Sequence, residues 1–169
     1  MKRLVFTSIL LNFLLSQQVF SQVNSYSSNN LSEKDISIEI SNEVEPLLNL
    51  LKNKGFNIKY KIPPIRGAYG LFQTRNKTIW ISPISFELGI GNQTILHEAT
   101  HAAQSCPNGL LSPIGLSLPV NQSMRNEIQT YLLRNYDIDQ HIIEQEAFYL
   151  QSQKNGVEIL IEAIKIRCK

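Results

Sequence analysis

The sequence lacks a marked excess of charge of either sign. Its 169 residues include 16 Lys and Arg against 14 Asp and Glu. Lys2 and Arg3 fall in a segment that we expect to be removed, which leaves 14 basic residues against 14 acidic ones. A neutral chain has no electrostatic basis for binding nucleic acid or an anionic membrane surface. We therefore expect neither of these as a partner.

Long apolar runs are also scarce, and the clearest one stands at the N-terminus. After two basic residues it extends from Leu4 to Leu15 and is followed by Val19-Phe20-Ser21. This pattern is typical of a secretory signal peptide over residues 1–21, cleaved before Gln22. The alternative is an uncleaved anchor, although the run is short for ~30 Å of hydrocarbon and polar residues interrupt it. We expect a secreted or periplasmic protein without stable membrane insertion.

Cysteine is limited to two residues, Cys106 and Cys168. Neither lies near the predicted cleavage point, which excludes a lipoprotein anchor there. In an oxidising compartment an even number of cysteines is normally paired. We predict a Cys106–Cys168 disulfide, with two free buried thiols as the alternative.

The remaining chain is long enough for one domain and contains no internal repeat. Residues 22–33 are rich in Ser and Asn and almost free of apolar side chains, which is typical of a flexible linker. We expect a single domain over residues 34–169.

The hydrophobic pattern of that domain predicts an α+β fold, with a small antiparallel sheet followed by a helical half. The metal-binding motif described below falls in this helical half. Residues 36–40 fit either a strand or the first part of a helix that is kinked or restarted near Asn42. The other predicted elements are a strand at 56–62, a hairpin of 69–74 with 78–82, a helix from an Asn92 N-cap, a loop over 106–123, and helices at 124–134, 137–153 and 157–167.

Histidine is scarce too, yet two of the three histidines form the motif His97-Glu98-x-x-His101. Residues four apart stack on one face of a helix, so the two imidazoles can bind one metal ion. Glu98 lies roughly 100° further around the helix, beside the metal rather than on it. There it can act as general base towards a zinc-bound water. The alternative is a chance match of two ordinary surface histidines.

A catalytic zinc needs a third protein ligand. The metzincin pattern would place a histidine where this chain has Pro107. Downstream, Glu146 lies on the predicted inward face of its helix, because its neighbours three and four residues away are apolar or aromatic. A buried carboxylate needs a cation or a proton. We predict Glu146 as the third ligand, with Glu144, His141 and Asp139 as alternatives.

His97-Glu98-x-x-His101 followed by the Glu-x-Glu-Ala of Glu144 to Ala147 resembles the gluzincin branch of zinc metallopeptidases. The resemblance covers about residues 92–105 and 138–152. It implies a glutamate as third zinc ligand and peptide-bond hydrolysis. It also implies that the strand before the metal helix, Thr78–Ser82, pairs with an extended peptide substrate. The acid often found four residues after the ligand is replaced by Leu150, so another group must orient the histidines.

The sequence therefore predicts an exported zinc metallopeptidase that acts on a peptide or protein substrate. An alternative is a zincin-like binding or envelope-assembly module that keeps zinc without turnover. A third possibility, a small helical interaction protein with a chance motif, predicts no bound metal. The sequence singles out no residue for stabilising the oxyanion; the available side chains are Tyr149, Tyr136, Tyr131 and His141.

Overall fold

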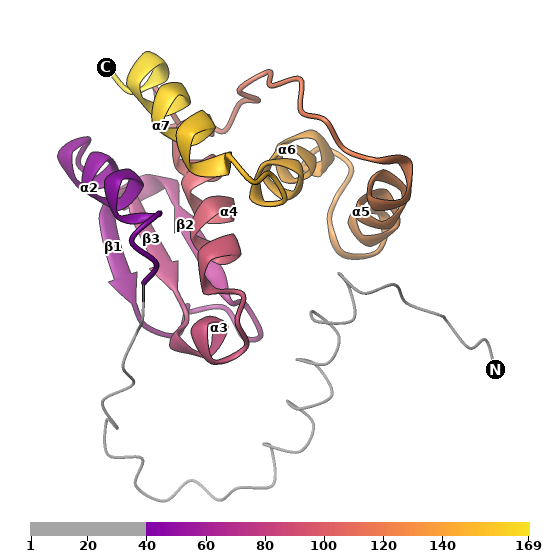
Figure 1. Ribbon diagram of the computed structural model, residues 1–169, viewed down its shortest axis with the longest axis horizontal. Helices are drawn as coiled ribbons and strands as arrows, with labels where there is room; N and C mark the ends of the chain where they lie inside the picture. The colour runs from indigo at the N-terminus through magenta and orange to yellow at the C-terminus, as the bar shows by residue number, and fades with distance from the viewer. Residues whose placement is uncertain (1–39) are drawn as a thin grey trace, which may run out of the picture. The chain divides into compact units, whose positions relative to one another are not determined.

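The computed structural model describes residues 40–169 (Figure 1). These residues belong to one compact unit. The predicted signal peptide (1–21), the predicted linker (22–33) and the expected start of the domain at Lys34 lie outside the described residues. No helix in the described part of the chain is long and apolar enough to cross a membrane.

The described residues form a small sheet followed by helices, which confirms the α+β prediction. The elements in chain order are α2 (Glu45–Asn53), β1 (Asn57–Tyr60), β2 (Gly70–Gln73), the 3-10 turn η1 (Thr74–Asn76), β3 (Thr78–Ile81), α3 (Pro83–Glu87), α4 (Gly91–Gln104), α5 (Gln122–Asn135), α6 (His141–Gln151) and α7 (Gly156–Arg167).

Helix boundaries follow local chemistry at some ends and not at others. α2 begins at Glu45, so Pro46 lies in its first turn, where a missing N–H costs nothing. Asn121 caps α5 by accepting a hydrogen bond from the Met124 N–H. The predicted Asn92 cap is wrong, because α4 already begins at Gly91. The short helix α3 was not predicted.

The sheet has the strand order β1-β3-β2. β2 and β3 form the predicted antiparallel hairpin, with Phe72 opposite Ile79. β1 pairs in parallel with β3, placing Ile58 on the other side of Ile79. The sheet is therefore mixed, and the prediction of a purely antiparallel sheet is wrong. The reason is that β2 occupies the edge, so the hairpin returns β3 to the place beside β1.

This topology corrects one implication of the gluzincin resemblance. β3, the strand expected to pair with an extended substrate, is the central strand and has a neighbour on each side. Its backbone groups are already used in the sheet. Within the described sheet, the free edges belong to β1 and β2.

α4 is the central helix of the domain (Figure 1). It packs against β2 and β3 on one side and against α6 on the other, while α7 packs on both α2 and α4. Ala99, Ala102 and Ala103 of α4 are completely buried, and their small size lets these elements approach closely. Trp80 instead lies half-buried on the outer face of the sheet, beneath Lys59.

The predicted disulfide between Cys106 and Cys168 is confirmed. It joins the second residue after α4 to the residue just after α7, across 62 positions of sequence. The bridge thereby closes a loop that contains the long connection to α5 and the three last helices.

We expect the double substitution Cys106→Ser/Cys168→Ser to lower the free energy of unfolding of the metal-free protein by about 2–4 kcal/mol. The physical reason is that the open unfolded chain gains the conformational entropy that the bridge removes. Urea denaturation measures the change. Reduced wild type is the matched control and should coincide with the variant; equal stability of oxidised wild type and variant would contradict the prediction.

Candidate metal centre

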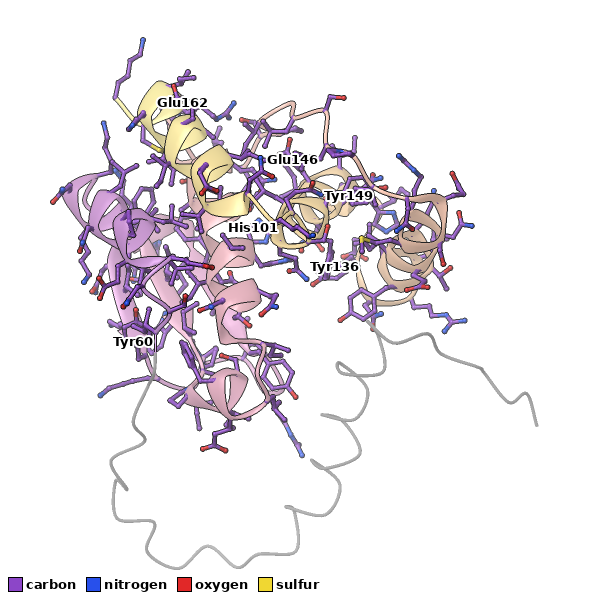
Figure 2. All side chains as sticks on the ribbon, in the orientation of Figure 1. Tyr60, His101, Tyr136, Glu146, Tyr149 and Glu162 are labelled. Atoms are coloured by element: carbon purple, nitrogen blue, oxygen red, sulfur yellow. A yellow bond between two sulfur atoms is a disulfide. The ribbon has the colours of Figure 1, made fainter. Side chains whose placement is uncertain are left out.

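α4 brings the two motif histidines to the helix face that meets α6. Four residues separate His97 and His101, and their ring centroids lie 4.8 Å apart. Both imidazoles are largely buried, with side-chain exposures of 12% and 9%. In Figure 2, His101 lies on the side of α4 towards α6, where Glu146 and Tyr149 are labelled.

Glu144 of α6 supplies an acid to this pair. Its Oε2 atom lies 3.3 Å from His97 Nε2 and 3.6 Å from His101 Nε2. The same oxygen is buried and has no hydrogen-bond partner. The three residues thus present one possible ligand atom each, all within 4.8 Å of one another.

Hydrogen bonds on the far side of each ring determine where the lone pairs point. His101 Nδ1 lies 2.8 Å from Gln104 Oε1, and His97 Nδ1 lies 2.8 Å from Gln151 Oε1. An amide oxygen can only accept, so Nδ1 of each ring donates its proton there. In a neutral imidazole Nε2 then carries the lone pair. Both Nε2 atoms therefore face the Glu144 carboxylate as acceptors.

Three acceptors that converge without a proton between them require a cation. A proton on one histidine would serve, and so would a metal ion. The two separations between Glu144 Oε2 and the Nε2 atoms fit a metal. The distances of 3.3 and 3.6 Å exceed the roughly 2.7–2.9 Å of a charge-assisted hydrogen bond. They match instead the ~3.3 Å that separates two ligands of a tetrahedral ion bound at about 2.0–2.1 Å.

Without a metal, the group is held together by its own charges. Burial by itself lowers the pKa of His101, but the adjacent Glu144 carboxylate, with the charge of Glu98, outweighs it and raises the pKa to about 9. Burial likewise raises the pKa of Glu144, yet the two histidines beside its carboxylate lower it to about 2. The site therefore strongly favours one positive charge beside the Glu144 carboxylate.

Glu98 lies next to this group, against the edge strand β2. It is only 6% exposed, and burial raises the pKa of its carboxyl, an effect that the neighbouring histidines partly oppose. A Cβ atom at Gly70 would lie 2.7 Å from Glu98 Cγ and 2.8 Å from its carboxyl carbon. The absence of a side chain at Gly70 is what lets the carboxylate reach its position.

Glu146, the predicted third ligand, does not join the histidines. Its carboxylate accepts hydrogen bonds from Gln104 Nε2 and from the backbone N–H groups of Ile114, Gly115 and Leu116, at 2.7–3.1 Å. It is buried, as predicted. These four donors stabilise the buried carboxylate, a role that the sequence argument assigned to a metal ion. The structure brings Glu144, one of the alternatives, to the histidines in its place.

The other residues considered from the sequence lie outside the group. Asp139 is exposed in the turn before α6, and the His141 ring makes a hydrogen bond to the Tyr136 carbonyl oxygen. Of the tyrosines, Tyr136 lies beside the site: burial raises the pKa of its hydroxyl, and the Glu144 charge raises it further.

Two glutamines contact the rings. For Gln104 the sequence favours an ordinary surface glutamine over a partner of a ligand histidine, and its complete burial beside His101 corrects that preference. Gln151 was not predicted. Gln104 is three residues after His101 on the same helix, a spacing that places the two side chains together. This spacing is visible in the sequence, but a glutamine on the exposed surface of a helix can have the same spacing. Gln151 is 54 residues from His97, and no local pattern connects them.

No protein-family model, curated protein sequence or solved structure matches this chain.

Proposed function

We propose that this chain is an exported zinc metallopeptidase. The observation that carries the proposal is the meeting of His97 Nε2, His101 Nε2 and Glu144 Oε2 with no partner for the buried oxygen. Two imidazoles and one carboxylate are a ligand set that zinc takes in hydrolytic enzymes, with one position left open. The helical glutamate from a second helix keeps the resemblance to gluzincins.

His97, His101 and Glu144 would hold the ion. Bound zinc supplies Lewis acidity, which polarises a carbonyl group and makes water acidic near neutral pH. The chain's own contribution begins with the glutamines, which keep both Nδ1 atoms protonated and both Nε2 lone pairs directed inward.

Glu98 is the residue to which we assign general-base catalysis. It lies beside the ligands without belonging to the group of three, so its carboxylate remains free to accept a proton from the attacking water at one of its oxygens. Burial raises its pKa, which makes it a stronger base than an exposed glutamate. The same oxygen can then return the proton to the leaving amine nitrogen.

Export is supported by two independent features. The N-terminal sequence has the pattern of a signal peptide. The disulfide is typical of proteins that reside in an oxidising compartment.

The activity can be tested with a broad peptide library and detection of products by mass spectrometry. We expect the mature, zinc-loaded protein to cleave peptides and a chelator to abolish cleavage. Restoring zinc should restore it. A protein that binds zinc and cleaves nothing would contradict the proposal and favour the binding-module alternative.

Gly70→Ala tests the position assigned to Glu98. The added methyl group overlaps the Glu98 side chain, which must move. Since a displacement of about 1 Å in a catalytic group can cost ~10²-fold in rate, we expect a loss of that order. Zinc stoichiometry should persist, because the three atoms nearest to the added methyl group all belong to Glu98 and not to a ligand. The measurements are peptide turnover and zinc content.

The matched control is Leu71→Ala on the same strand, whose side chain points to the opposite face of the sheet. It should retain most of the turnover. Full activity in Gly70→Ala would show that Glu98 tolerates displacement and would contradict its assigned role.

A further inference from the structure

Gln104 connects the candidate metal centre to the rest of the fold through both ends of its amide. The side chain is completely buried. Its Oε1 accepts from His101 Nδ1 at 2.8 Å, and its Nε2 donates to Glu146 Oε2 at 2.9 Å and to the Ile143 carbonyl oxygen at 3.0 Å. All three hydrogen bonds of this amide are therefore made to residues of α4 and α6.

The two acceptors on Nε2 determine how the amide is oriented. Turning it over would place Oε1 against the Glu146 carboxylate and the Ile143 carbonyl oxygen, neither of which has a proton to give. It would also place the NH₂ group against His101 Nδ1. The orientation that satisfies Gln104 is therefore the one that requires a proton on His101 Nδ1.

Glu146 is itself held in a fixed position. The consecutive N–H groups of Ile114, Gly115 and Leu116 donate to its two oxygens. These residues lie in the connection between α4 and α5, so the connection, Glu146, Gln104 and His101 form one continuous series of hydrogen bonds. Each member of the series orients the next.

We propose that Gln104 and Glu146 are positioning residues for the metal centre. Glu146 orients the Gln104 amide, and Gln104 holds His101 with its Nδ1 protonated and its Nε2 lone pair directed at the ion. This inference rests on the proposed function. It assigns to Gln104 the role of orienting a histidine. Four residues after Glu144, where the gluzincin pattern often has an acid for that role, this chain has Phe148.

The first test compares zinc affinities by competition with a chromophoric chelator. Gln104→Met keeps the length of the side chain and removes both hydrogen-bonding ends. We expect zinc binding to weaken about 10–100-fold, the usual scale for a group that orients a metal ligand. The matched control is Gln145→Met on α6, whose amide donates to the Tyr149 hydroxyl and not to a histidine. That variant should bind zinc like wild type.

A second pair of variants separates positioning from simple loss of packing. Gln104→Glu places a carboxylate against the Glu146 carboxylate, and like charges at that distance repel. Combining it with Glu146→Gln restores a donor opposite an acceptor. We expect the double variant to bind zinc at least ~10-fold more tightly than Gln104→Glu alone, since the contact between positions 104 and 146 regains a donor and an acceptor. It should stay below wild type, because the Ile114 N–H, which shares Glu146 Oε2 with Gln104, loses its acceptor.

Nuclear magnetic resonance gives a readout that packing alone would not change. In zinc-loaded wild type, the His101 Nδ1 proton should be visible and protected from exchange by its bond to Gln104. It should be lost in Gln104→Met and return in the double variant. If Gln104→Met does not fold, the comparison of Gln104→Glu with the double variant decides the question.

The failure of this inference differs from the failure of the proposed function. Tight zinc binding by wild type, with unchanged affinity and an unchanged Nδ1 proton in Gln104→Met, would overturn the positioning roles alone. A double variant no tighter than Gln104→Glu would overturn the role of Glu146. Absence of zinc binding in wild type would overturn both the metal centre and the positioning roles.

Discussion

His97→Ala and His101→Ala are each expected to abolish stoichiometric zinc binding. Wild type should bind about one zinc per chain, as two imidazoles and a buried carboxylate require. If ~10–16 kcal/mol of zinc binding is shared among the three ligands, each accounts for roughly 3–5 kcal/mol, or at least ~10²-fold in affinity. Elemental analysis after dialysis at limiting zinc measures the loss. His141→Ala, at the remaining histidine, is the matched control and should keep its zinc.

The two glutamates of α6 provide a sharper contrast within the same experiment. Glu144→Ala should lose zinc like the histidine variants, because Glu144 Oε2 faces both Nε2 atoms. Glu146→Ala should still bind zinc at saturating concentration, with reduced affinity, and should be less stable. Its removal leaves buried N–H donors without an acceptor, at about 1–3 kcal/mol for each group left unsatisfied. The opposite result, with zinc lost only in Glu146→Ala, would return the third-ligand role to Glu146.

Glu98→Gln should separate binding from turnover. The amide keeps the size and hydrogen bonding of the side chain but has no basic oxygen. We expect the variant to fold, to bind zinc like wild type, and to lose at least ~10²-fold in the rate of peptide cleavage, the usual scale for a positioned acid–base group. The measurement is the initial rate on any peptide that wild type cleaves in the library.

Glu158→Gln, which changes an exposed glutamate of α7, is the control for the loss of one carboxylate. Its zinc content and cleavage rate should equal those of wild type. Identical product profiles from wild type and Glu98→Gln would mean that Glu98 does not take the proton. The assignment of the metal ligands would then remain, and the assignment of Glu98 as general base would be wrong.

The sequence by itself determined the features that depend on local spacing and on counting. Residues four apart on a helix share a face, so the pairing of His97 with His101 required only that α4 form. Two cysteines allow one intramolecular bridge, and the Cys106–Cys168 disulfide is present. The hairpin was predictable because alternating β-rich runs separated by a few polar residues pair with each other.

Only the tertiary structure decided which glutamate meets the histidines. The helical pattern predicted that Glu146 is buried, and it is, but α6 is covered on two sides. One side meets α4, where Glu144 lies, and the other meets the connection after α4, where backbone N–H groups surround Glu146. A periodicity in sequence reports that a side chain is buried and not which neighbour buries it. The order of the strands and the Gln151 contact to His97 are likewise non-local, because both depend on how segments distant in sequence come together.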